Sequence, residues 1–68
     1  MKYTLKQWRT LKGMSQTELA DAVGVTYVTM NRWENGKGKS PRYVDLVKLS
    51  TVLETGGIDN IIMPYDLT

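Results

Sequence analysis

Residues 15–36 read SQTELADAVGVTYVTMNRWENG, and this stretch predicts two short helices joined by a tight turn. Ser15 and Glu18 have the spacing of a capping box, in which two backbone N–H groups at a helix start find acceptors. Gly24 ends the first helix, because a left-handed backbone conformation costs least in a residue without Cβ. The apolar residues of this helix recur at helical spacing and form one stripe: Leu19, Ala20 and Val23.

The second helix of the stretch has its own start, inward face and end. Thr26 is its predicted N-cap, Met30 and Trp33 are its predicted inward residues, and Asn35-Gly36 marks its end. Two helices in this arrangement form a helix-turn-helix, the motif that lays its second helix in the major groove of DNA.

The length limits the chain to one small domain, and the composition lacks two of the residue types most common in active sites and metal sites. Its 68 residues are 41% hydrophobic and 24% charged, as in ordinary globular domains. A domain of this size buries only about 60% of its unfolded surface. The sequence has no cysteine and no histidine, which removes disulfides, thiolate metal sites and the usual imidazole base or zinc ligand. We therefore expect no metal and no cofactor.

The start of the chain and its short apolar runs indicate a cytoplasmic location. Residues 1–4 lack the apolar stretch of a signal peptide. The longest apolar run, residues 61–63, is far shorter than the roughly 20 residues of a membrane span. No membrane association is expected.

Charge is distributed unevenly along the chain, although the net charge is only +2. Residues 1–42 carry eight basic and three acidic side chains, whereas residues 43–68 carry one basic and four acidic ones. A basic half and an acidic half favour a molecule with one face for a polyanion.

Helices are also expected on both sides of the motif. A glycine-rich basic loop over residues 36–40 precedes Ser40-Pro41, where proline is expected at the first helical position because its missing N–H costs nothing there. Residues 1–63 are predicted to form the domain and residues 64–68 a loose C-terminal tail. The five predicted helices cover residues 4–12, 16–23, 27–35, 41–53 and 58–62.

The same periodicity predicts which further side chains face inward. In the first helix, Leu5, Trp8 and Leu11 recur at helical spacing. Met14 and Val25 are apolar residues in the two connections that follow. The expected core positions outside the stripe above are Leu5, Trp8, Leu11, Met14, Val25, Val44, Leu46, Val47 and residues 49–53.

Four signatures together resemble the Cro/repressor (XRE-type) helix-turn-helix family, in particular the DNA-binding domains of lambdoid phage repressors. The resemblance covers residues 4–62 without a large insertion. It implies an all-α fold, a compact bundle of five short helices, and a dimer bound to a pseudo-palindromic operator in double-stranded DNA. The signatures are Ser15-Gln16-x-Glu18-Leu19-Ala20, Gly24-Val25, Trp33-Glu34-Asn35-Gly36-Lys37 and Pro41-Arg42.

The outward face of the second motif helix is the predicted base-reading surface. Tyr27, Val28, Asn31 and Arg32 fall on one side of this helix, opposite Met30. Arg32 is suited to guanine O6 and N7, and Asn31 to adenine N6 and N7. Val28 is assigned to a thymine methyl, and Tyr27 to a methyl or a phosphate. The alternative is that this face is exposed only to solvent. An adjacent Tyr-Val pair is unusual on such a face.

A second group of residues is predicted to hold the DNA backbone. Gln16 stands at a helix start, where backbone N–H groups attract anions. The resemblance implies that Arg42 enters the minor groove, where narrow A·T tracts attract arginine. The predicted phosphate and minor-groove contacts are Gln16, Thr26, Asn35, Lys37, Lys39, Arg42 and Tyr43.

Arg9 and Glu34 are expected to have a structural role. Both lie near core-facing positions of their helices, and the resemblance implies that they pair in a largely buried salt bridge. Removal of one partner of such a pair costs roughly 3–5 kcal/mol.

An enzyme is the first alternative class, and the sequence argues against it. Gly38-Lys39-Ser40 imitates the end of a phosphate-binding loop, but Trp33 stands where that pattern requires glycine and no strand precedes it. The chain also lacks clustered carboxylates in a plausible cleft.

We therefore expect a sequence-specific transcriptional regulator, of the repressor type found in phages and bacteria. The alternative is an antitoxin or another protein-interaction module on the same fold that also represses its own operon. A homodimer is expected, since one copy makes few contacts. Candidates for its contact are Ile61, Ile62, Met63 and Tyr65, with capping of the core as the alternative role of this segment.

Overall fold

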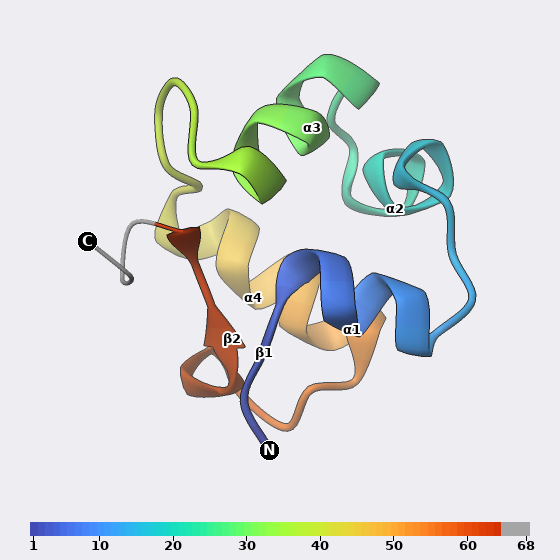
Figure 1. Cartoon of the computed structure of the whole chain (residues 1–68), viewed down its shortest axis with the longest axis vertical. Coiled ribbons are helices and arrows are strands. Elements are labelled where there is room, and N and C mark those ends of the chain that lie inside the picture. The colour runs from blue at the N-terminus through green and yellow to red at the C-terminus, as the bar shows by residue number, and fades with distance from the viewer. Residues whose placement is uncertain (65–68) are drawn as a thin grey trace.

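The computed structural model describes residues 1–64, and helices dominate them (Figure 1). The 3-10 helix η1 and two very short strands complete the described part. The elements in chain order are β1 (Tyr3–Thr4), α1 (Leu5–Leu11), α2 (Gln16–Val23), α3 (Tyr27–Asn35), α4 (Tyr43–Leu53), η1 (Ile58–Asn60) and β2 (Ile61–Ile62).

The predicted helical fold around a helix-turn-helix is confirmed, but the predicted fifth α-helix over residues 58–62 is wrong. Residues 1–64 contain four α-helices, and the last segment forms η1 followed by β2. β2 pairs in parallel with β1, with Tyr3 opposite Ile61 and Thr4 opposite Ile62. Two adjacent isoleucines favour an extended backbone, and the N-terminal segment supplies the hydrogen-bonding partner. Figure 1 shows the two strands side by side, next to α1 and α4.

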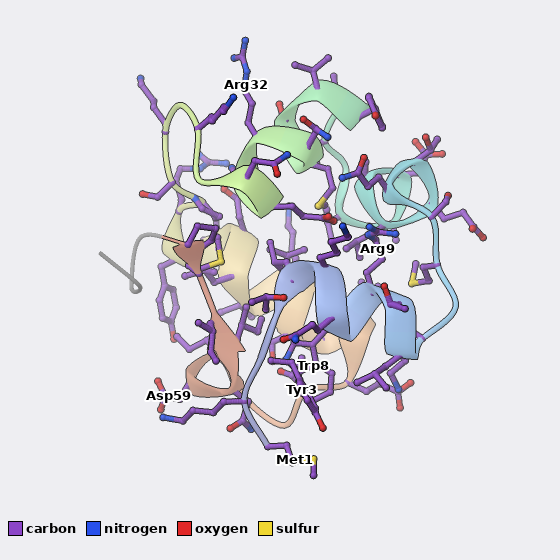
Figure 2. All side chains as sticks on the ribbon, in the orientation of Figure 1. Met1, Tyr3, Trp8, Arg9, Arg32 and Asp59 are labelled. Carbon is purple, nitrogen blue, oxygen red and sulfur yellow. The ribbon has the colours of Figure 1, made fainter. Side chains whose placement is uncertain are left out.

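The strand pair is attached to α1 through Trp8. Its indole Nε1 donates to the backbone oxygen of Asn60 at 2.8 Å. The rings of Tyr3 and Trp8 meet edge to face with centroids 5.1 Å apart, and Figure 2 shows them together beside β1. The two ends of the described chain are thereby joined to the helical core.

Capping fixes the starts of the first two helices. Thr4 caps α1 and exchanges hydrogen bonds with Gln7, and Ser15 does the same with Glu18 for α2. The backbone N–H of Ser15 donates to Glu18 Oε1 at 2.9 Å. This bond, together with the hydrogen bond from the Ser15 side chain, lowers the pKa of Glu18.

The start of α4 differs from the expected one. Pro41 is buried and precedes the helix, whose N-cap is Arg42 and whose first residue is Tyr43. Asp45 accepts a hydrogen bond from the Arg42 backbone N–H at 3.0 Å. A carboxylate in the first helical turn therefore supplies the start that proline was expected to provide.

The core draws on α1, α2, α3, α4 and β2. Partly buried side chains of Trp8, Met14, Val25, Leu46 and Val52 pack against it. Val25 thus holds the turn of the motif against the core, as expected. The buried residues of the core are Leu5, Leu19, Ala20, Val23, Met30, Trp33, Leu49, Leu53, Ile61 and Met63.

Four predicted core positions are wrong, because Leu11, Val44, Val47 and Thr51 lie on the surface. The exposures of Leu11, Val44 and Val47 are 63%, 51% and 39%. α1 is short, and Leu5 and Trp8 already occupy its inward face. In α4 the inward face follows Leu46, Leu49 and Leu53, which turns the two valines outward.

Candidate nucleic-acid interface

Two helices and a three-residue turn build the candidate interface. Gly24 ends α2 in the left-handed conformation, with φ +76°, and the Val25 N–H donates to the Ala20 oxygen at 2.9 Å. Thr26 Oγ1 accepts from the Thr29 N–H at 3.2 Å and so caps α3. The capping bond and the partly buried Val25 together define the direction in which α3 leaves the turn.

α3 has one buried and one exposed face. Met30 is 0% exposed and Trp33 is 5% exposed, so they anchor the helix in the core. Tyr27 and Val28 are 51% and 54% exposed at the start of the helix. Figure 2 shows Arg32 extending away from the body of the molecule on the outer side of α3. We call Tyr27, Val28 and Arg32 the reading face.

Asn31, the fourth residue predicted on this face, is only half-exposed and is held by neighbours within the chain. Its Nδ2 donates to Gln16 Oε1 at 3.4 Å. Its Oδ1 and backbone oxygen both accept from Asn35 Nδ2, at 3.3 and 2.9 Å. The structure therefore places Asn31 between α2 and the end of α3.

Gln16 lies at the first position of α2, half-buried against α3. Its Nε2 donates to Glu34 Oε1 at 3.0 Å. This bond ties the start of α2 to the end of α3, which are the two sites where a DNA backbone would pass a helix-turn-helix. The sequence prediction did not include the link from Gln16 to Glu34.

Arg9 and Glu34 form a salt bridge behind the interface. Arg9 Nε lies 2.8 Å from Glu34 Oε2, and Nη2 donates to Oε1 at 3.2 Å. The Arg9 side chain is 14% exposed and that of Glu34 only 2%. Arg9 Nη1 also donates to the Met14 oxygen at 2.9 Å, so one guanidinium joins α1, α3 and the α1–α2 connection.

Three cations flank the reading face, and we call Lys37, Lys39 and Arg42 the basic rim. All three are exposed, and they lie on the connection that leads from α3 to α4. Figure 1 shows this connection as a loop that projects beside α3. A groove between α3 and this connection is lined by Thr29, Arg32, Trp33, Gly38, Lys39, Ser40, Arg42 and Asp45.

The remaining predicted backbone contacts lie around the same surface. Tyr43 is 68% exposed at the start of α4, next to the basic rim. Asn35 is exposed at the end of α3 and bonded to Asn31, and Thr26 is exposed at the start of α3. The predicted DNA-backbone contacts thus lie around α3: Thr26 stands at its start, Asn35 at its end, and Gln16 is bonded to Glu34 near that end.

Asp45 shapes the electrostatics of the basic rim. Its burial alone would raise the pKa of its carboxyl group, but hydrogen bonds from the Arg42 backbone N–H and side chain, with the charges of Arg42 and Lys48, lower the pKa below its usual value. The Arg42 Nε lies 3.3 Å from Asp45 Oδ2, although 79% of the Arg42 side chain is exposed. The three-residue spacing of Arg42 and Asp45 is a sequence signal that could have predicted this pair.

Two of the four residues proposed for a dimer contact, Ile61 and Met63, contribute to the core. Ile61 and Met63 are each 6% exposed. They therefore cap the core, which was their alternative predicted role, and are not available for a dimer contact. Ile62 is half-buried, and Tyr65 lies outside the described residues. Pro64 rests against Gly36 at the end of α3.

Residues 1–64 hold neither a cluster of metal-binding side chains nor a membrane-spanning helix. No group of three or more carboxylate, thiol or imidazole side chains in this part of the chain could hold a metal ion. Among the same residues, every helix is too short or too polar to cross a membrane.

Comparison with protein families agrees with this geometry. A family model described as helix-turn-helix matches residues 5–57, which include all four α-helices. The chain belongs to this helix-turn-helix family. The resemblance to Cro/repressor (XRE-type) domains is thereby confirmed, and this helix-turn-helix protein is a DNA-binding regulator in general terms. Searches of curated proteins and of solved structures found no significant match.

Proposed function

We propose that this protein is a sequence-specific transcriptional repressor that reads the major groove of its operator with α3. The observation that carries the proposal is the division of α3 into two faces. Met30 and Trp33 are buried, whereas Tyr27 and Val28 stay about half-exposed without covering any part of the core. Apolar side chains at the start of such a helix suit thymine methyl groups, and Arg32 suits guanine.

The basic rim supports the proposal through its charge. Lys37, Lys39 and Arg42 lie beside the reading face, where flanking phosphates would pass. Contacts to phosphates orient a protein on DNA and make its affinity depend on salt, without selecting a sequence. Each such contact contributes about −0.9 to the slope of log K against log salt, so the rim predicts a slope of about −2.7 for each copy.

We further propose that two copies act together on a pseudo-palindromic operator. One copy offers a single reading helix, and regulators of this kind bind two half-sites about one helical turn apart. The contact between the copies has to involve side chains other than Ile61 and Met63, because those lie in the core.

Selection of duplexes from a random pool tests the proposal most broadly. The expected result is a recurring motif with two related half-sites, bound with an affinity that falls steeply between low and moderate salt. Binding to no duplex at low salt, or equal binding to all duplexes, would contradict it. Sedimentation of the protein with the selected duplex then reports how many copies bind.

A further inference from the structure

A chain of side-chain hydrogen bonds runs from the buried salt bridge to the surface of α3. Glu34 Oε1 accepts from Gln16 Nε2 at 3.0 Å, and Gln16 Oε1 accepts from Asn31 Nδ2 at 3.4 Å. Asn31 Oδ1 in turn accepts from Asn35 Nδ2 at 3.3 Å. With Arg9, these residues connect α1, α2 and α3.

The Glu34 carboxylate determines the direction of every bond in this chain. An ionised carboxylate only accepts hydrogen bonds, and this one is 2% exposed and paired with Arg9. Gln16 must therefore turn its NH₂ group toward Glu34 and its oxygen toward Asn31. That oxygen requires the NH₂ group of Asn31, which leaves the Asn31 oxygen for Asn35.

Readout of adenine by Asn31 would have to share amide groups that are already bonded within the protein, because hydrogen bonds to Gln16 and Asn35 use one donor and one acceptor site of this side chain. Bidentate recognition of adenine uses the amide NH₂ group and the amide oxygen of one side chain together. In Asn31 the first faces Gln16 and the second faces Asn35, and the residue is half-buried. Tyr27, Val28 and Arg32, which form the reading face, are not members of this chain of hydrogen bonds.

We infer that Asn31 is a positioning residue, which acts through Gln16 to hold α3 at a defined angle against α2. The inference rests on the proposed DNA-binding function and replaces one predicted base contact with an indirect role. Asn31 lies one residue before Arg32 and one helical turn after Tyr27 and Val28. Its loss therefore changes how all three residues of the reading face meet the bases, and not the preference at a single base pair.

A comparison of base preferences tests this role. Asn31→Ala, Gln16→Ala and the double variant are measured against the selected duplex and all its single-base-pair substitutions, with Arg32→Ala as the matched reader variant. Asn31→Ala is expected to reduce discrimination partially at several base pairs, whereas Arg32→Ala loses it at one. In the double-mutant cycle, the combined loss of affinity should be smaller than the product of the single losses by about twofold or more, as for residues in one network.

Two results would overturn the inference: complete loss of preference at one A·T pair in Asn31→Ala, or single losses that multiply without coupling. Melting temperatures of all variants identify any that fail to fold. If Asn31→Ala fails, Asn31→Ser, which shortens the side chain and removes its NH₂ donor, takes its place in the same cycle.

A measurement on the free protein separates the inference from the proposed function. In ¹⁵N-resolved NMR spectra, Gln16→Ala should shift the side-chain NH₂ signals of Asn31, and the exposed control Lys39→Ala should leave them unchanged. Unmoved Asn31 signals in Gln16→Ala would overturn the inference even if DNA binds. Failure of the wild-type protein to bind any duplex would instead overturn the proposed function.

Discussion

Removal of the Glu34 carboxylate is expected to destabilise the fold more than any change at an exposed ion pair. In Glu34→Ala, Arg9 loses both of its bonds to the carboxylate, and the Gln16 NH₂ group loses its acceptor. The Arg9 side chain is only 14% exposed, so water replaces these bonds poorly. Breaking one side of a buried pair costs about 3–5 kcal/mol.

This loss is large for a chain of 68 residues, whose expected total stability is about 3–10 kcal/mol. A loss of 3 kcal/mol corresponds to a fall of about 12 °C or more in melting temperature. Urea unfolding followed by tryptophan fluorescence measures the change, because Trp33 is buried and Trp8 half-buried. A variant that is unfolded without urea also satisfies the prediction.

Two controls make this prediction specific. Lys12→Ala removes the exposed pair of Lys12 with Glu54, whose side chains are 34% and 76% exposed, and should cost at most about 1 kcal/mol. The double variant Arg9→Met/Glu34→Leu removes both buried charges and should regain much of the lost stability. An unfolding free energy of Glu34→Ala within 1 kcal/mol of wild type, about the cost of the exposed pair, would show that the buried salt bridge does not stabilise the fold.

Three further predictions concern the turns, the acid range and the basic rim. Gly36→Ala should cost more stability in urea unfolding than Gly24→Ala. Both glycines have positive φ, which costs alanine about 1–2 kcal/mol, but only at Gly36 would a Cβ meet another atom, 2.7 Å from Pro64 Cβ; equal losses would contradict this. The lowered pKa of Asp45 means that its ionised form stabilises the fold above the unfolded pKa near 3.8 and that this contribution disappears as the pH falls through the folded value. Unfolding free energies of Asp45→Asn should therefore fall less steeply than those of wild type in this acid range, and parallel curves would refute the assignment. Lys37→Ala should weaken all duplexes alike and lower the salt slope by about 1, and a change of base preference would contradict its role as a phosphate contact.

The helix-turn-helix could be predicted from sequence because its signals are local. The capping pair Ser15 and Glu18, the glycine at position 24 and the cap Thr26 each act within a few residues, and the observed α2 and α3 have the predicted bounds. Met30 and Trp33 occupy the inward positions that periodicity assigned to them.

The strand pair could not be predicted in the same way, because its signal is not local. Residues 58–62 have apolar spacing that fits one helical turn, and the choice of a strand depends on β1 at the other end of the chain. Similarly, Val44 and Val47 are apolar without being buried, since the orientation of α4 is set by Leu46, Leu49 and Leu53 together.

The interface was predictable in its residue types and less so in their internal bonds. Exposed positions of α3 follow from its buried ones, so Tyr27, Val28 and Arg32 could be placed from periodicity. The involvement of Asn31 with Gln16 depends on the distance between two helices, which one sequence does not contain. From the sequence alone Asn31 is therefore predicted as a base reader, and the link to Gln16 is visible only in the structure.

The most direct test of the central claim, that α3 reads DNA sequence, is the base preference of Arg32→Ala. Competition binding compares wild type and variant on the selected duplex and all its single-base-pair substitutions. The variant is expected to lose about 1–3 kcal/mol of discrimination at one G·C pair of each half-site and to keep its salt slope almost unchanged. Preferences identical to those of wild type at every base pair would contradict it.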